Sequence, residues 1–297
     1  MKKNIFSLIA LMAMLLAILV PKTYAAEPNQ TGWYWLTSDD NYSKYIDPES
    51  VVITKAVTTN HGKVPTDIEV WTKTGYSYAG AAETIDSYEL KEKLPDPAKL
   101  SYSTARLLIK PQNRTVQYLE EHFFDANGAP IWSKATAGKV HEVNSQQFDE
   151  AFYTAAIDQA AGTNDETNRA KASDRWLTIY DVTTPTGVRT HTTADTSTMR
   201  MKDNNLVFWE WEETKDSNGQ VVEIKFMKVA ANLPEGTERV VTGQYWSAST
   251  GWQSMDADLD GTYRMISPES SEYQSIVALR QCAEKHSRWI NRYSLDN

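Results

Sequence analysis

Hydrophobic and polar residues alternate along much of this 297-residue chain, which predicts β-strands with one buried face. In residues 115–124 (TVQYLEEHFF), the alternation places Val116, Tyr118 and Phe124 on one face and Phe123 on the other. The turn-forming residues DANG follow this run directly, so we expect a hairpin there. Several runs of this kind, separated by Gly, Asn and Asp, indicate antiparallel sheets.

The spacing of the hydrophobic residues becomes helical near the end of each half. In the second half it predicts a helix with Ser267 as its N-cap and Pro268 in its first turn. The apolar stripe of that helix is Ile276, Leu279, Ala283, His286 and Ile290. In the first half, Asn144 and Gln147 resemble a capping box at the start of another helix. The apolar stripe of that helix is Phe148, Phe152 and Ala155.

The same order of elements occurs twice, which indicates a tandem repeat. Residues 68–74 (IEVWTKT) resemble residues 206–214 (LVFWEWEET), two strand-like runs centred on Trp71 and Trp209. Each half is a run of strands followed by a helix that can cover one sheet face. We therefore predict an α+β fold of two similar domains, each an antiparallel β-sheet with a C-terminal helix packed on it. Residues 162–174 contain no aromatic or large aliphatic side chain and are expected to form a linker.

The N-terminus has the pattern of an export signal. Lys2 and Lys3 precede an apolar run, residues 5–20, and small residues lead up to Ala25, after which we expect cleavage. An uncleaved membrane anchor is the alternative, but the run of about 16 residues is shorter than the roughly 20 that a spanning helix needs.

These patterns define the expected organisation of the chain. We predict a signal peptide at 1–25, a first domain at 26–161 and, after the linker, a second domain at 175–297. The expected location is extracytoplasmic: the periplasm, the cell surface or the medium. No later stretch is long and apolar enough to cross a bilayer, so no membrane span is expected after removal of the signal.

The net charge limits the possible partners, and the cysteine content limits how the domains can be stabilised. The formal net charge is −9, which argues against nucleic acid or an anionic membrane surface. Cys282 is the only cysteine, so an intrachain disulfide is excluded and the domains depend on their apolar cores. We expect Cys282 to be a small buried side chain, with a reactive thiol or an intermolecular bridge as the alternatives.

Asp256, Asp258 and Asp260 occupy every second position before Gly261, as at the start of an EF-hand calcium loop. The twelfth position, which should be Glu, is Ser267, and the preceding residues have the pattern of a strand and hairpin. We therefore expect a loop between strands, since Asp and Gly favour turns. The alternative is a calcium site formed by the three carboxylates.

The sequence contains none of the local motifs that we examined for catalysis or cofactor binding. The five histidines are dispersed, and phosphate-binding, dinucleotide-binding and nucleophile-elbow motifs are absent. Glu210 and Glu212 could be the two carboxylates of a glycan hydrolase, but two Glu alternating with Trp are typical of a half-exposed strand. We predict neither catalytic activity nor a cofactor.

Aromatic side chains are abundant in the sequence, at 11% of all residues. Most must be buried, but Trp and Tyr are also enriched in binding hot spots. We predict a binding patch that consists of Trp209, Trp211, Tyr245 and Trp246.

Three short segments resemble a known family. KYIDPESVVI (44–53) and IEVW (68–71) in the first half, and RMISPESSEYQSIVALRQC (264–282) in the second, are similar to the surface-adhesin protein E-like domain of exported bacterial proteins. In the second half, HTTADTSTMRM stands where the Asp-Pro motif is expected, and the first half lacks the Pro-Ser start of the last helix. The resemblance implies a non-enzymatic domain outside the cytoplasm, with adhesion as its role.

We therefore expect an exported binding protein, and the resemblance implies a surface adhesin that acts through contact with another protein. The alternatives are a periplasmic envelope-accessory protein without a host partner and, less favoured, a glycan hydrolase. The sequence leaves open whether the ligand is a protein or a cell-wall component, and whether the chain forms oligomers.

Overall fold

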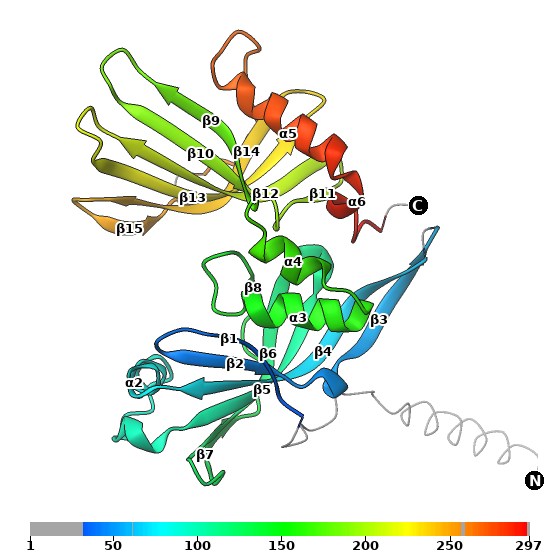
Figure 1. The fold of residues 1–297 in the computed structure, drawn as a ribbon, viewed down its shortest axis with the longest axis vertical. Helices are drawn as coiled ribbons and strands as arrows, with labels where there is room; N and C mark the ends of the chain where they lie inside the picture. The colour runs from blue at the N-terminus through cyan, green and yellow to red at the C-terminus, as the bar shows by residue number, and fades with distance from the viewer. Residues whose placement is uncertain (1–31, 61, 257–258, 296–297) are drawn as a thin grey trace, which may run out of the picture.

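The computed structural model describes residues 32–60, 62–256 and 259–295, and these residues form two domains that lie one above the other in Figure 1. The expected signal peptide at 1–25 and Asp258 lie outside the described residues. No helix within the described residues has the length and hydropathy needed to cross a membrane.

The first domain is built on an antiparallel sheet of eight strands. Its main path follows the order β1-β2-β4-β5-β6-β7, with β3 paired to β4 and β8 paired to β6. The strands are β1 (Tyr34–Ser38), β2 (Tyr42–Ile46), β3 (Val52–Thr59), β4 (Gly62–Tyr76), β5 (Tyr102–Lys110), β6 (Thr115–Phe124), β7 (Pro130–Lys134) and β8 (His141–Glu142).

The second domain repeats this topology strand for strand. Its eight-stranded sheet follows the order β9-β10-β12-β13-β14-β15, with β11 paired to β12 and β16 paired to β14. The strands are β9 (Trp176–Thr183), β10 (Arg189–Asp195), β11 (Arg200–Lys202), β12 (Asn205–Lys215), β13 (Val221–Asn232), β14 (Thr237–Ser247), β15 (Gly251–Ser254) and β16 (Arg264–Met265). The predicted class, two similar α+β domains, is confirmed.

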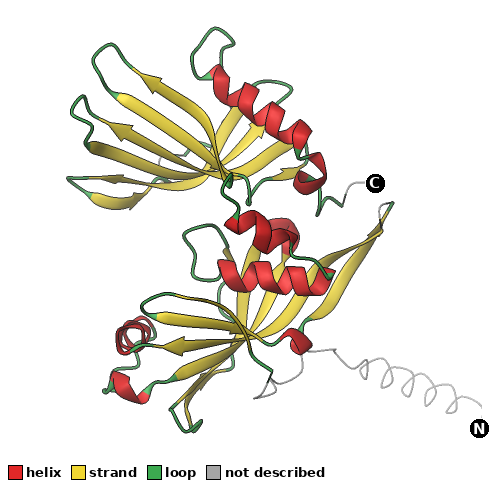
Figure 2. Ribbon diagram, in the orientation of Figure 1, coloured by secondary structure: helices red, strands yellow, loops and turns green. Residues whose placement is uncertain are grey.

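One helix after each sheet closes the core of its domain (Figure 2). In the first domain, Phe152 and Tyr153 of α3 (Glu150–Ala161) pack in one cluster with Val70 and Leu107 of the sheet. In the second, Ile276 and Leu279 of α5 (Tyr273–Lys285) pack with Phe208 and Val229. Cys282 lies in this second core, where burial raises the pKa of its thiol, so it is a buried apolar side chain as expected.

Both helices begin later than their sequences predicted. The segment after Ser267 forms a turn in which the Ser267 hydroxyl accepts from Glu269 N, and α5 starts at Tyr273. Ile290, the last residue of the predicted stripe, belongs to a separate short helix, α6 (Ser287–Ile290). In the first domain, Asn144 accepts from Gln146 N in a similar turn, and α3 begins at Glu150. Local turn hydrogen bonds therefore replaced the expected N-caps.

An additional helix, α2 (Tyr78–Ser87), covers the far end of the first sheet. Ala81 and Ile85 of α2 pack against Phe123 in a separate apolar cluster. Gly80 permits this close approach, because a Cβ atom there would lie 2.2 Å from the Asn41 carbonyl oxygen. Residues 74–104, which are an insertion relative to the second half, thus enlarge the core.

A β-bulge in β6 overturns the side-chain directions predicted for residues 115–124. Leu107 pairs with Tyr118 but Arg106 pairs with Glu120, so Leu119 is the extra residue of the bulge. Beyond it the alternation is inverted. Phe123 is therefore buried in the core, whereas Phe124 lies on the opposite face from Val116 and Tyr118.

A turn after β2 locks that strand to β4 through one serine. The Ser50 hydroxyl donates to Asp47 O at 2.7 Å and accepts from Trp71 N at 2.9 Å. The short helix η1 (Pro48–Ser50) lies within this turn, and the Asp47 carboxylate caps it by accepting from Glu49 N. The Asp-Pro motif of the sequence is thus structural.

The second domain makes the same hydrogen bonds with different residues. The Thr198 hydroxyl donates to Asp195 O at 2.8 Å and accepts from Trp209 N at 2.9 Å. The segment HTTADTSTMRM thus occupies the place of the Asp-Pro motif and forms its turn without proline. The two turns are therefore more similar in their hydrogen bonds than in their sequences.

The segment expected to be a linker, 162–174, contains helix α4 (Asp165–Lys171), which lies at the junction of the two domains (Figure 1). The Asp158 carboxylate accepts from the main-chain N–H groups of Glu166 and Thr167, each at 2.9 Å, and so caps α4 from the end of α3. This connection is therefore an ordered helix with a buried carboxylate, Glu166, at its start.

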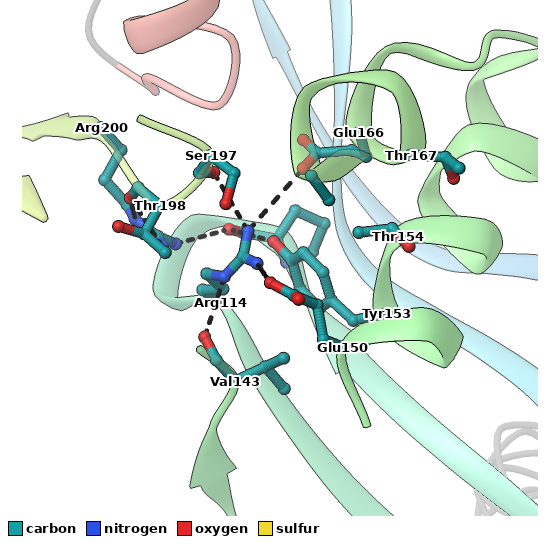
Figure 3. A network of polar contacts seen from close by, with 12 residues as sticks. Arg114, Val143, Glu150, Tyr153, Thr154, Glu166, Thr167, Ser197, Thr198 and Arg200 are labelled. Atoms are coloured by element: carbon teal, nitrogen blue, oxygen red, sulfur yellow. Dashed lines mark hydrogen bonds and ion pairs between the residues drawn. The ribbon is translucent and has the colours of Figure 1, made fainter. Parts of the chain in front are cut away.

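Arg114 lies at the centre of the contact between the domains and has no exposed surface (Figure 3). Its guanidinium group donates to Val143 O at 2.8 Å, to Glu150 Oε1 at 2.9 Å and to Ser197 O at 3.2 Å. Ser197 belongs to the second domain, so this one side chain joins the first sheet, α3 and the second domain.

Two further arginines extend the network on either side. Arg175 donates both to Glu150 Oε1 and to Asp195 Oδ2 at 2.7 Å. Arg292 donates to Glu166 Oε1 at 2.7 Å, and the Tyr293 hydroxyl donates to the same oxygen at 2.5 Å. Each of these three guanidinium groups is thus paired with a carboxylate, the arrangement that makes burial of charge tolerable.

We expect Glu166→Gln to lower the free energy of unfolding by about 3–5 kcal/mol, because it leaves the Arg292 charge buried without its carboxylate. Burial alone would raise the pKa of Glu166, but Arg292 and Arg114 outweigh it and the net shift is downward. The contribution of Glu166 is therefore present above the unfolded-state pKa and disappears as the pH falls through the folded-state pKa. Urea denaturation at pH 7 and at lower pH measures both effects.

The exposed Glu235→Gln substitution is the matched control and should change stability by less than about 0.5 kcal/mol. Equal losses in the two variants, or a loss from Glu166→Gln that does not shrink in acid, would contradict the assigned role.

Candidate functional site

The second sheet has one face without a helix, and this face is lined with aromatic side chains. Residues directly paired across antiparallel strands point to the same side of a sheet. Trp211 is paired with Phe226, and Trp246 is paired with Trp252. Trp209 lies on the same face as Trp211, two positions away, whereas Phe208 between them enters the core beneath α5.

Four of these side chains form a chain of ring contacts, which we call the aromatic ladder: Trp209, Phe226, Trp211 and Trp252. Trp209 stacks on Phe226 with ring centroids 4.7 Å apart, and Trp211 lies 6.0 Å from Phe226 and 6.0 Å from Trp252. Strands β12 and β15 are three positions apart, which corresponds to about 14 Å in a flat sheet. The Trp211 and Trp252 rings therefore lean toward each other over the intervening strands.

The two ends of the ladder differ in exposure. Trp209 is 8% exposed and Trp252 is 47% exposed, so the ladder begins at the domain interface and ends in solvent. At the buried end, Glu142 of the first domain accepts from Trp209 Nε1 at 3.2 Å and from Lys228 Nζ at 2.5 Å. The first domain thus fixes the orientation of the innermost ring.

The structure brings together three of the four predicted patch residues. Trp209, Trp211 and Trp246 share the helix-free face, but Tyr245 pairs with Lys225 and lies on the opposite face, where its hydroxyl donates to Gln253 at 3.1 Å. Phe226 and Trp252 were missed as members of the patch. The pairing register that aligns them with Trp211 and Trp246 was not contained in the local pattern of either strand.

The first sheet carries an aromatic surface on its own helix-free face. Trp71 stacks on His122 with centroids 6.0 Å apart, and Tyr102 stacks on Phe124 at 4.9 Å. Lys73 Nζ lies 4.3 Å from the Tyr102 ring centroid, and burial lowers the pKa of this ammonium group. The two domains therefore present aromatic rings on equivalent faces, but the ring contacts differ: Lys73 lies over a ring in the first, whereas four rings contact one another in the second.

Two aspartates of the calcium candidate, Asp256 and Asp260, lie between β15 and β16. Asp256 accepts from the Thr242 hydroxyl and from Gly243 N, while Asp260 accepts from the hydroxyl and main-chain N–H of Thr262. A strand, β15, precedes the loop where an EF-hand has a helix. Within the described residues, which do not include Asp258, no cluster of three or more metal-binding side chains occurs.

Glu210 and Glu212 lie on the α5 side of the second sheet. Burial, followed by repulsion from Glu238 and Glu212, raises the pKa of Glu210 well above its ordinary value. Glu212 is paired with Lys225 Nζ at 2.8 Å. The two carboxyl groups occupy neighbouring same-face positions of one strand, whereas a glycosidase places its pair on opposite sides of the substrate bond.

Comparisons with known proteins add little to this geometry. No protein family and no curated protein matches the sequence. Among solved structures, part of the chain aligns with one described as "The structure of Haemophilus influenzae protein E", with a TM-score of 0.25 and 17% sequence identity. The alignment covers 48% of this chain and 96% of that chain. At this level of similarity it supports no conclusion about function, which has to come from the residues of the chain.

We expect Glu210→Gln to be at least as stable as the wild type at pH 7. Because the folded-state pKa of Glu210 lies above its unfolded value, the native state holds this proton to a higher pH, and the wild type loses stability as the pH rises between the two values. The Gln variant lacks this loss, so its advantage should disappear near pH 4.5. Urea denaturation over this range measures the difference, with the exposed Glu269→Gln as the control.

A variant that is less stable than the wild type at pH 7, with a deficit that shrinks in acid, would mean that Glu210 is ionised and favourably paired.

Proposed function

We propose that this chain is an exported binding protein without catalytic activity, and that it presents the aromatic ladder on its second sheet to a protein partner. The observation that carries the proposal is the continuous contact of Trp209, Phe226, Trp211 and Trp252, which rises from a buried anchor to a half-exposed tryptophan. Tryptophan in such partly buried clusters supplies much of the affinity of protein interfaces.

The surroundings of the ladder favour a protein over a small apolar ligand. Polar side chains border the rings on the same face, including Thr193 beside Trp211 and Gln244 beside Phe226. An aromatic centre with a polar rim is the usual composition of a protein interface. The rings are already held by one another and by Glu142, so little side-chain entropy is lost on binding.

The proposal also includes export from the cytoplasm and a role in adhesion. They are supported by the apolar run of residues 5–20 with its expected cleavage after Ala25, and by the resemblance of KYIDPESVVI to an adhesin-like family. Membership of that family is proposed on the same residues. The alternative is an envelope-accessory protein that stays in the periplasm. Protease added to intact cells distinguishes them, since a surface protein is digested and a periplasmic protein is spared.

We expect the double variant Trp211→Ala/Trp252→Ala to bind a partner at least about tenfold more weakly than the wild type, because hot-spot tryptophans contribute roughly 2 kcal/mol or more each. The probe is a panel of immobilised extracellular-matrix proteins and cell-wall glycans, measured with residues 26–297 at low and high salt. Trp35→Ala is the matched control, because Trp35 is an exposed tryptophan of β1 in the first domain.

Binding to a matrix protein that survives high salt and depends on the two tryptophans would support the proposal. Binding to cell-wall glycans alone would favour the accessory role. A partner whose binding is unchanged in the double variant, or equally weakened by Trp35→Ala, would contradict the assignment of the ladder as the binding surface.

A further inference from the structure

A cavity of about 470 Å³ lies between the two domains, next to the buried end of the aromatic ladder. The first domain contributes residues from the end of β5 through η3 (Pro111–Asn113) to the start of β6, and also from the region of β8. The second contributes β11 and facing positions of β12 and β13. The polar side chains that line the cavity include Lys110, Asn113, Thr115, Arg200, Lys202 and Lys228.

The cavity is strongly cationic although the whole chain has a net charge of −9. Four of its lining residues are Lys or Arg, and Glu142 is the one carboxylate among them. Glu142 is already occupied, because one of its oxygens accepts from Lys228 and the other from Trp209. In the part of the chain that the structure describes, no carboxylate lies within ion-pair distance of Lys110, Arg200 or Lys202.

Arg200 is the most unusual member of this group. It is 7% exposed, yet among the described residues its guanidinium group donates only to main-chain carbonyl oxygens: Thr198 O at 3.1 and 3.2 Å, Pro111 O at 3.3 Å and Gln112 O at 3.4 Å. Burial, and to a smaller extent repulsion by Arg114, lowers the pKa of Arg200 to about 10. A guanidinium group has five N–H donors, so these four contacts leave one for a ligand.

The partners of Arg200 differ from those of the other three interface arginines. Arg114, Arg175 and Arg292 each have a carboxylate partner within 2.9 Å. A buried charge without a counter-charge is costly, and the cost falls when an anion is bound beside it. The site is therefore electrostatically incomplete in the protein alone.

We propose that this interdomain cavity binds a tetrahedral oxyanion, that is, a phosphoryl or sulfate group of a small ligand. Arg200 forms the buried wall, and Lys110 and Lys202, one from each domain, provide ammonium groups at the opening. The Thr115 hydroxyl and the Asn113 amide line the same space and can donate further hydrogen bonds. The cavity volume lies within the range of small-molecule sites, and the acidic chain around it disfavours a long nucleic acid.

This site is separate from the aromatic ladder, and its proposal does not depend on the proposed protein partner. Because its cations come from both domains, an anion bound there would cross-link them. Binding should therefore also raise the melting temperature of the whole chain.

Isothermal titration of residues 26–297 with sodium pyrophosphate and, separately, with a sulfated disaccharide tests the proposal. We expect saturable one-to-one binding of at least one probe at low salt, weaker at 150 mM salt, with an increase in melting temperature. The double variant Lys110→Glu/Lys202→Glu should weaken binding by at least about tenfold, since it reverses two of the facing charges. Neither lysine is buried, so the variant should fold.

Lys93→Glu/Lys99→Glu is the matched control, because both lysines are exposed in the first domain away from the cavity and the change in net charge is the same. The control should bind like the wild type. The probe that binds identifies the ligand as a phosphate or a sulfate ester. Absence of binding by both probes at low salt, or equal loss in the two double variants, would overturn the proposal.

Discussion

The arrangement of this protein depends on the requirement that buried guanidinium groups be paired. Arg114, Arg175 and Arg292 lie where α3, α4, the second sheet and the C-terminal residues meet, and each is paired with Glu150 or Glu166. A network of this kind adds little stability compared with an apolar core, but removing one member is costly because its partner is left charged and buried. It joins the two domains directly, because Arg114 and Arg175 each contact residues of both. The interdomain cavity is lined by both domains, and the innermost ring of the aromatic ladder is hydrogen-bonded to Glu142 of the first domain, so both regions depend on this arrangement.

The two domains show how a repeated fold acquires different surfaces. The turn hydrogen bonds of Asp47 and Ser50 are reproduced by Asp195 and Thr198, so the backbone is held in the same way. The second aspartate has an additional use, because its carboxylate accepts from Arg175 and thereby ties β10 to the interface. The same divergence separates the helix-free faces. The first has Lys73 over the Tyr102 ring, whereas the second has four rings in continuous contact with one another.

Much of the fold could be predicted from the sequence, because strand and helix patterns are local. The repeat, the antiparallel sheets and the terminal helices follow from hydrophobic periodicity that is visible within ten or fifteen residues. The bulge at Leu119 could not be predicted, since it depends on which residues of β5 lie opposite. For the same reason Tyr245 was included in the predicted patch and Trp252 was left out of it. The pairing of Arg114 with Glu150 and Ser197 joins segments far apart in sequence, and nothing local marks it.

Glu142 and Lys228 connect the two proposed binding regions. Glu142 orients Trp209 at the base of the ladder, and the same carboxylate neutralises Lys228 at the wall of the cavity. A substitution at Glu142 would release the tryptophan and add an unpaired cation to the cavity at the same time, so it cannot assign either region. Substitutions that test one region alone must be made at the outer ends, at Trp252 on the ladder and at Lys202 in the cavity. Residues of the interface therefore fix the geometry of both regions, and for that reason substituting them does not show which region carries a function.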